Sequence, residues 1–322
     1  MNLKTNIPVN LDLTIRSGQL FHWTKTANNT FKIIIRRTVI KANQINENFI
    51  KVEIKGEKLD EEKLRTTLGL NIERQKLLTI LKKDKLISQI IPSYEGLTIM
   101  KQDPYECLIS FMASAVSNIP RIMLNLNNLR DETGTLIMGS NDNSLPSAKD
   151  IVCIGEERLR NIGLGYRSKF IYLTCKKLIE EQISLASWLI KTDSELLTLL
   201  TQFPGVGRKI AECVMLFGFG RLSAFPVDIW VQRGLIYLMP NLKNMSPVDL
   251  SEWGTNRWGE AAGMASRFFS VPQKMGKYLT KLLFQKFFFF GGKETIQIFH
   301  RFICGFLNLF VSITPLILRQ LV

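Results

Sequence analysis

The chain has 322 residues, 46% of them hydrophobic, which excludes a disordered protein and is enough for two or three subdomains. Its formal charge of +14 favours a polyanionic partner such as nucleic acid, although an AT-rich genome would also inflate lysine. Five cysteines without a CxxC pair, and only two histidines, argue against a zinc or iron–sulfur site and predict reduced thiols.

The first part of the chain has the pattern of β-structure. The runs Phe31–Ile33 and Phe49–Ile54 alternate partially between apolar and polar residues, so we expect residues 1–56 to be rich in strands. Between residues 60 and 92 the apolar spacing becomes helical. The sequence therefore predicts strands first and helices after them.

Helical spacing continues to about residue 263. Asp103-Pro104 is typical of a helix start, because proline fits the first helical position. Gly163-Leu164-Gly165 predicts a break between two helices. Asp193 or Ser194 is expected to cap a helix over 195–202 that leads into the most informative segment of the chain.

That segment is Phe203-Pro204-Gly205-Val206-Gly207-Arg208-Lys209-Ile210-Ala211, which predicts a tight hairpin that opens a helix. A helix start presents unpaired N–H groups that suit a phosphate. Lys209 and Cys213 are four residues apart, so they share one face of this helix.

Asp228 follows nineteen residues after Lys209, in Phe225-Pro226-Val227-Asp228, where it is expected to cap the next helix. The helix start would keep its carboxylate ionised, ready to stabilise a developing sugar cation or to move a proton. A neutral Lys209 amine could attack a sugar C1′, displace a base and leave a Schiff base that permits β-elimination. Alternatively, Asp228 is an ordinary cap and Lys209 only touches a phosphate.

Residues 264–322 differ in composition from the rest of the chain. They hold 11 of the 20 phenylalanines, eight basic residues and a single acidic residue, Glu294. Residues 302–318 are almost uninterrupted apolar, at the lower limit of about 17 residues for a membrane span.

Five ordered motifs resemble the helix-hairpin-helix DNA glycosylases, and within them the 8-oxoguanine DNA glycosylase/AP lyase branch. One is the hairpin with Lys209 and Asp228. The other four are Leu13–Trp23, Gln102–Phe111, Asn118–Ile122 and Ile162–Arg167.

This resemblance, over roughly residues 8–263, implies the fold class and the domains. We expect an α+β protein with a small antiparallel β-rich domain over 1–100 and a mainly helical helix-hairpin-helix catalytic domain over 101–263. The atypical tail would cover 264–322. Lys209 would be the Schiff-base nucleophile and Asp228 its catalytic partner.

The resemblance also implies how base and DNA are bound. Gly18 would offer its backbone carbonyl to the N7–H of the oxidised guanine, Cys213 would line the flipped base, and Phe269 would be the nearest candidate for the grip on its other side. Tyr166 and Arg167 would enter the duplex opposite the lesion. Gly205, Val206 and Gly207 would hold a phosphate, either directly or through a monovalent cation. The full set of expected DNA-contacting residues is Asn118, Arg121, Tyr166, Arg167, Gly205, Val206, Gly207 and Trp230.

Three departures from the branch stand out. Val116 lies where an asparagine is usual, which predicts a relaxed preference for the opposite base. Trp230 lies near the position where some members have a histidine. Ser266 and Ser270 stand where the last core helix usually supplies a glutamine and a phenylalanine, so we hypothesise a frameshift or a replaced tail after about residue 264.

The leading prediction is a bifunctional enzyme, a DNA glycosylase/AP lyase that excises 8-oxoguanine. A glycosylase for an alkylated purine, an inactive or altered-specificity DNA-binding homologue, and a membrane-attached protein are the alternatives, in falling order. We expect double-stranded DNA with an oxidised purine as the partner, a monomer without an obligatory protein partner, and no metal or organic cofactor. The absence of a signal-peptide core favours an intracellular, DNA-associated protein, in a bacterial cytoplasm over a nucleus.

Overall fold

The structure is a computed structural model that describes residues 1–270. The apolar stretch 302–318 lies outside the described residues, as does most of the predicted tail domain. Among the residues that are described, no helix has the length and apolar character needed to cross a membrane.

A five-stranded antiparallel sheet forms the N-terminal part, in the strand order β1-β5-β4-β3-β2. The two runs that alternate in the sequence lie in β3 and β5, which confirms the expected β-rich start. Phe31 and Ile40 are fully buried and pack with Ile15 of helix α1 and Met100 in one core cluster. The elements of this part are β1 (Asn2–Lys4), α1 (Leu11–Arg16), β2 (Trp23–Ala27), β3 (Thr30–Ile35), β4 (Thr38–Asn46) and β5 (Phe49–Gly56).

Helices form most of the rest of the described chain, so the predicted α+β class is confirmed. They are α2 (Glu61–Thr67), α3 (Arg74–Lys82), α4 (Lys85–Ile90), α5 (Pro104–Ala113), α6 (Ile119–Thr133), α7 (Ala148–Leu159), α8 (Arg167–Glu180), α9 (Asp193–Thr201), α10 (Arg208–Phe217), α11 (Ile229–Leu238), α12 (Pro247–Trp258) and α13 (Ala262–Phe269).

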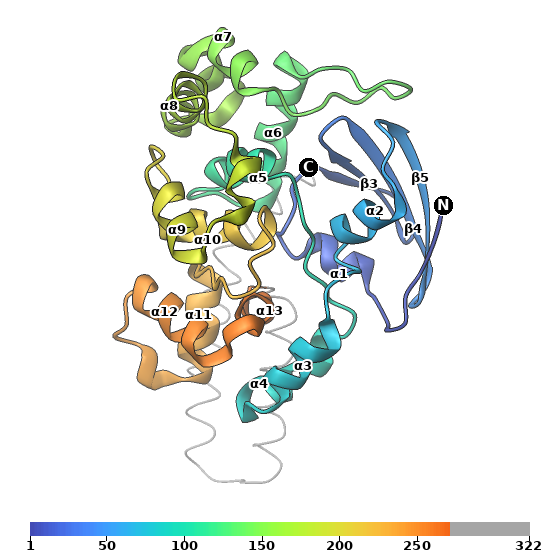
Figure 1. Cartoon of the computed structure of the whole chain (residues 1–322), viewed down its shortest axis with the longest axis vertical. Helices are drawn as coiled ribbons and strands as arrows, with labels where there is room; N and C mark the ends of the chain where they lie inside the picture. The colour runs from blue at the N-terminus through green and yellow to red at the C-terminus, as the bar shows by residue number, and fades with distance from the viewer. Residues whose placement is uncertain (271–322) are drawn as a thin grey trace, which may run out of the picture. The chain divides into compact units, whose positions relative to one another are not determined.

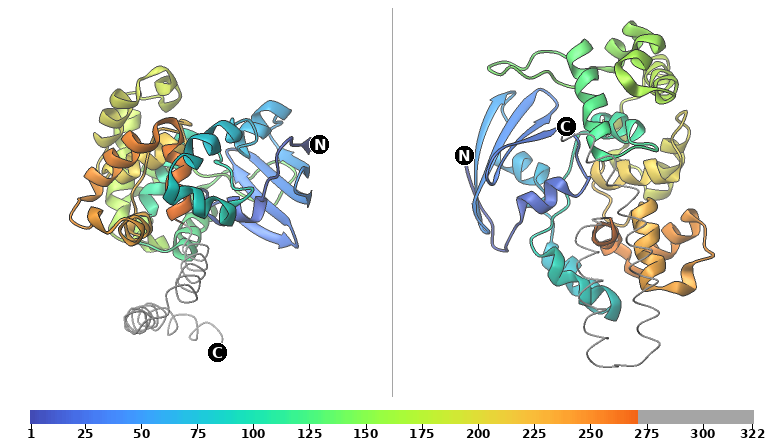
Figure 2. Two further views of the ribbon diagram at one scale, coloured as in Figure 1. Left: turned by 90° about the horizontal axis from the view of Figure 1, so that it is seen from below. Right: turned by 180° about the vertical axis from the view of Figure 1, so that it is seen from behind.

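Helix α5 lies between the sheet and the helices α8, α9 and α10, as both the front and back views show (Figures 1 and 2). Its start follows the sequence: Asp103 caps it by accepting hydrogen bonds from the N–H groups of Tyr105 and Glu106, and Pro104 is its first residue. Every residue from Glu106 to Ala113 is buried. The helix that leads to the site is therefore the hydrophobic centre of this part of the molecule.

One predicted cap is wrong. Thr192, and neither Asp193 nor Ser194, caps α9, because its hydroxyl oxygen accepts from the N–H of Glu195 while the Glu195 carboxylate accepts from the N–H of Thr192. The predicted helix break is present, with Gly163 at φ 106° inside η2 (Arg160–Leu164) and Gly165 at φ 58° between η2 and α8.

The last described helix, α13, crosses the predicted boundary at residue 264. All eight of its residues are buried, and it packs against α11 and α12. A core helix is therefore present at least as far as Phe269, beyond the point where the hypothesis placed the shift. The origin of the sequence after it stays a hypothesis.

Candidate active site

Lys209, the second residue of α10, is half-buried against α5. Its Nζ lies 5.5 Å from the centre of the Phe111 ring and donates a long hydrogen bond, 3.4 Å, to the Ser114 hydroxyl. No ion pair holds it among the described residues. An amine with an aromatic floor and one weak polar partner keeps its lone pair accessible to a substrate once it is deprotonated.

The hairpin before α10 uses its two glycines differently. Gly205 has φ +76°, and a Cβ there would lie 2.5 Å from Cγ of Phe170, so only glycine fits. Gly207 has φ −86° and open space around it, which corrects the expectation that it too makes the turn. It is the N-cap of α10 and provides no side-chain cap, so the first N–H groups of that helix stay uncovered. Val206 is buried, and its N–H donates to the Phe203 carbonyl at 3.1 Å.

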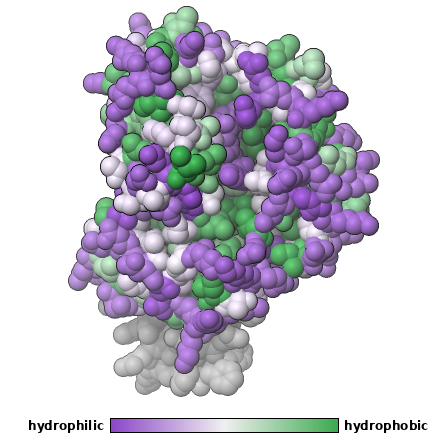
Figure 3. All heavy atoms as spheres, viewed as in Figure 1, coloured by the Kyte–Doolittle hydropathy of each residue, from purple (hydrophilic) through white to green (hydrophobic). Residues whose placement is uncertain are grey.

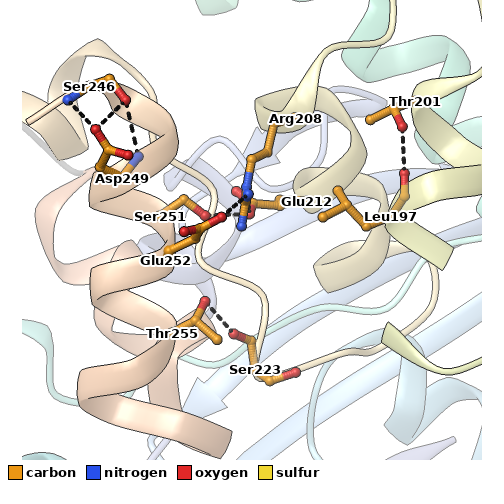
Figure 4. A network of polar contacts seen from close by, with 10 residues as sticks. All are labelled: Leu197, Thr201, Arg208, Glu212, Ser223, Ser246, Asp249, Ser251, Glu252 and Thr255. Atoms are coloured by element: carbon orange, nitrogen blue, oxygen red, sulfur yellow. Dashed lines mark hydrogen bonds and ion pairs between the residues drawn. The ribbon is translucent and has the colours of Figure 1, made fainter. Parts of the chain in front are cut away.

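An ionic network fixes the start of α10 to α12 (Figure 4). Arg208 Nε donates to Glu212 at 2.9 Å and Arg208 Nη1 donates to Glu252 at 2.7 Å. The Ser251 hydroxyl donates to the same Glu212 carboxylate. The residue next to Lys209 is thus held from two helices, which fixes the direction in which the lysine leaves α10.

Asp228 is the N-cap of α11, as predicted. Its Oδ1 accepts from the N–H groups of Trp230 and Val231 at 2.9 and 2.8 Å. Both cap hydrogen bonds end on one oxygen, so the second oxygen of this half-buried carboxylate can face a substrate.

The charged groups of the candidate site act on the buried thiol of Cys213. Burial raises the pKa of its thiol to about 11, while the charges of Lys209 and Arg267 lower that pKa and the charge of Asp228 raises it. The thiol is therefore neutral, which fits a wall of a pocket and not a nucleophile. The charges of Lys209, Asp228 and Arg267 therefore all act on one buried side chain.

Gly18 borders this region from the N-terminal part. It has φ +78°, follows α1, and a Cβ on it would lie 3.5 Å from Cδ1 of Ile119 at the start of α6. The preceding carbonyl, of Ser17, accepts a 3.4 Å hydrogen bond from Arg267 Nη1. The predicted reader of the base thus lies between α6 and α13.

Arg167 makes hydrogen bonds to the backbone before α6. Its Nε donates to the Ala115 carbonyl at 2.6 Å and its Nη2 to the Val116 carbonyl at 2.9 Å. The guanidinium also covers the Tyr166 ring at 4.9 Å. In this structure Arg167 holds the turn before α6, and its contact with an orphaned cytosine stays a prediction.

Arg167 supports the turn of residues 115–117 before α6, which we call the tip and which is exposed at Val116. Val116 is 92% exposed and has φ 49°, an uncommon conformation for a β-branched residue. Tyr166 is 49% exposed, and its ring meets Phe170 edge-on at 6.4 Å, next to Gly205. These side chains link the tip to the hairpin and are available to a duplex.

The remaining predicted DNA contacts lie at helix starts. Asn118 caps α6 by accepting from the N–H of Arg121 at 3.0 Å, and both are exposed. Trp230 is half-buried and lies under the Arg233 guanidinium at 5.4 Å. Their contacts with DNA stay predictions.

Phe269 has the contacts of a core residue. It is 1% exposed, packs on Gly234 of α11 and lies 5.9 Å from the Trp258 ring. Arg267, two positions earlier, lies on the opposite side of α13, toward Ser17. The contact of Phe269 with the base stays a prediction.

Sequence reasoning missed three functional candidates: Ser114, Arg208 and Arg267. Only Arg267 had a signal, because it is the single charged residue between Ala261 and Phe269. On the face drawn in Figure 1, hydrophobic residues gather in the hollow between the helices and the sheet (Figure 3). A separate cavity of about 710 Å³ has a lining that includes Pro104, Ala148 and Leu178 and none of the predicted site residues.

Comparison with known proteins shows which family the chain resembles. Residues 2–108 match the model of the 8-oxoguanine DNA glycosylase N-terminal domain. The predicted resemblance to the 8-oxoguanine DNA glycosylases is confirmed.

Full-length relatives extend this match. The N-glycosylase/DNA lyase OGG1 of Arabidopsis thaliana is 29% identical over 291 residues, which cover 84% of this chain and 78% of the relative. A probable N-glycosylase/DNA lyase of Methanothermobacter thermautotrophicus is 29% identical over 62% of this chain and 70% of its own length. The same fold occurs in the Clostridium acetobutylicum 8-oxoguanine glycosylase/lyase bound to DNA with cytosine opposite 8-oxoguanine. That structure has a TM-score of 0.77 and 24% identity, and the match covers 86% of this chain and 98% of that one.

Proposed function

We propose that this 8-oxoguanine glycosylase homologue excises 8-oxoguanine from double-stranded DNA and then cleaves the strand at the abasic site. The names of its relatives confirm the enzyme class, a DNA N-glycosylase with lyase activity. The observation that carries the proposal for this chain is that Lys209 and Asp228 stand at the starts of α10 and α11, and that the charges of both act on the buried thiol of Cys213.

The chemistry follows from these two residues. The neutral Lys209 amine attacks C1′, the C1′–N9 bond breaks, and its electron pair leaves with the purine. The Asp228 carboxylate stabilises the positive charge that develops on the sugar. The attached amine then loses its protons as the C1′–O4′ bond of the sugar ring opens and O4′ takes up a proton, which leaves a Schiff base between Lys209 and C1′. Loss of a C2′ proton from this Schiff base expels the 3′ phosphate by β-elimination.

The DNA surface supports a flipped-base mechanism. The uncovered N–H groups at the start of α10 suit a backbone phosphate. A monovalent cation there would have to rely on backbone carbonyls, because the described residues form no cluster of acidic, histidine or cysteine side chains. Val116 and Tyr166 would fill the space that the base leaves, without the hydrogen bonds of an asparagine.

An altered specificity is the second candidate, and α13 favours it. Ser266 is fully buried and its hydroxyl donates to the Gly263 carbonyl, so it does not replace a glutamine as a base reader. The helix itself is present through Phe269, so loss of the whole base-pocket helix no longer supports the inactive alternative.

Borohydride trapping tests the proposal. The wild-type chain and Lys209→Gln are each incubated with a duplex that carries one 8-oxoguanine opposite cytosine, and with a duplex that has a preformed abasic site. Lys41→Gln is the matched control, because this lysine pairs with Glu53 on the N-terminal sheet. We expect a covalent adduct on both duplexes for wild type and control, and none for Lys209→Gln.

The other outcomes separate the candidates. Trapping only on the abasic duplex would support the altered-specificity candidate, because the nucleophile works and the base is not accepted. No adduct on either duplex would refute the proposed activity. The monomeric state, the opposite-base preference and the cellular compartment stay predictions.

A further inference from the structure

Arg267 is a buried cation that lacks a full set of partners. It is 4% exposed, and its one hydrogen bond among the described residues is the 3.4 Å contact to the Ser17 carbonyl. Its Nε is buried without a hydrogen-bond partner. A guanidinium offers five N–H donors and no acceptor, so one long hydrogen bond within residues 1–270 leaves most of its donors available to a ligand.

The Arg267 side chain and Lys209 lie against the same pair of stacked aromatic rings. Its guanidinium lies 5.3 Å from the centre of the Phe217 ring, and Phe217 stacks on Phe111 with ring centres 5.5 Å apart. Lys209 Nζ lies 5.5 Å over that second ring. Two cations thus cover the two members of one stacked pair, and Cys213 interacts electrostatically with both.

Such a cation is costly, since burial disfavours the charged form and lowers its pKa. The charge of Asp228 acts in the opposite direction, but the described residues contain no ion pair to Arg267. An anion bound next to the Arg267 guanidinium would supply the ion-pair partner that the described residues do not. In a glycosylase, the reaction itself creates an anion there, on the base that departs.

We propose that Arg267 stabilises the negative charge that develops on the departing purine and so acts in base excision, but not in strand cleavage. This inference rests on the proposed glycosylase function. When the C1′–N9 bond breaks, its electron pair spreads over the ring nitrogens and oxygens of the purine. These are all acceptors, which a donor-only guanidinium at the pocket wall matches. Lys209 forms the new bond to C1′, and the base afterwards takes a proton from solvent.

The test measures the two steps separately in the full-length chain. Single-turnover release of 8-oxoguanine reports excision, and cleavage of a duplex with a preformed abasic site reports the lyase step. Arg267→Met keeps the volume and removes the charge, while Arg267→Lys keeps the charge. Arg158→Met, a surface variant that loses only an exposed pair with Glu132, is the matched control.

We expect Arg267→Met to slow excision on the order of 10²-fold and to change abasic-site cleavage less than about twofold. Arg267→Lys should retain an intermediate excision rate, and Arg158→Met should change neither step. The loss in Arg267→Met should grow for a damaged purine whose N9 anion is less stable, because such a leaving group depends more on the cation.

Each contrary result has a distinct meaning. Equal excision by wild type and Arg267→Met would overturn the proposal. Equal losses in both steps, or a collapsed melting temperature for both Arg267 variants, would also overturn it, because Arg267 would then position Lys209 or support the fold. Failure of wild type to release any purine would instead refute the proposed function.

Discussion

Two arginines near the site contrast sharply. Arg208, at the start of α10, forms hydrogen-bonded ion pairs with Glu212 and Glu252, whereas Arg267, on α13, is buried beside a single carbonyl. The first has the environment of a structural brace. The second has that of a group whose partner arrives with the substrate. A charged side chain that stabilises the fold has its ion-pair partners within the protein. A charged side chain that binds a ligand lacks such a partner until the ligand arrives.

The contrast holds only if residues at the starts of α10 and α11, such as Asp228, take part in base excision. Asp228→Asn keeps a side chain that caps α11 well and removes the charge. We expect excision to fall about 10³-fold, while the free energy of unfolding changes by less than about 1 kcal/mol. Base release and denaturant unfolding measure the two quantities. Excision within tenfold of wild type would remove Asp228 from the mechanism.

Arg208→Met tests the paired arginine. It leaves the Glu212 carboxylate, 5% exposed, with the Ser251 hydroxyl as its remaining donor. Breaking one side of a buried pair should lower the free energy of unfolding by about 3 kcal/mol. The double variant Arg208→Met/Glu212→Gln should recover much of this loss in urea unfolding. A loss below about 1 kcal/mol for the single variant would mean that Arg208 does not brace α10.

Glu106 extends the contrast to a carboxylate. It is buried on α5, accepts only the Arg36 N–H, and burial raises its pKa from 4.5 to about 7. A raised folded-state pKa means that its stabilising contribution is complete below pH 4.5 and is lost as the pH rises through 7. Glu106→Gln should therefore remove a decline of about 3 kcal/mol in unfolding free energy between pH 4.5 and 8. Parallel pH profiles for wild type and variant would contradict this.

The smallest expected effect is the change in stability of the Arg267→Met variant, and it distinguishes the two arginines directly. Because Arg267 lacks an ion-pair partner, Arg267→Met should leave the free energy of unfolding unchanged or raise it by about 1 kcal/mol. Thermal melting of the free protein, next to Arg208→Met, measures the difference. If Arg267→Met loses more than about 2 kcal/mol, the fold itself needs this charge.

Local patterns predicted much of the site. Asp103 precedes Pro104 and Asp228 precedes the apolar start of the next helix, so the sequence located them as the caps of α5 and α11. The nineteen-residue spacing from Lys209 to Asp228 likewise indicated two consecutive helix starts. At α9 the sequence offered three adjacent polar residues, and the choice of Thr192 depended on the reach of Glu195.

Distant contacts could not be predicted in this way. Arg267 meets Ser17 across 250 residues, and Arg167 reaches the Ala115 carbonyl across 52. Periodicity marks α13 as apolar, but it does not say that Phe269 faces α11 and α12 while its neighbour faces the site. Such roles depend on which helices meet, and that is decided by tertiary packing.

The tie between Arg167 and the turn before α6 has a further consequence. Its two hydrogen bonds fix the carbonyls of Ala115 and Val116 in the free protein. The conformational entropy of ordering this exposed tip is thus lost during folding and not on association with DNA. A protein with a preformed probe of this kind can test many undamaged positions briefly, since each encounter requires the duplex, and not the protein, to change shape.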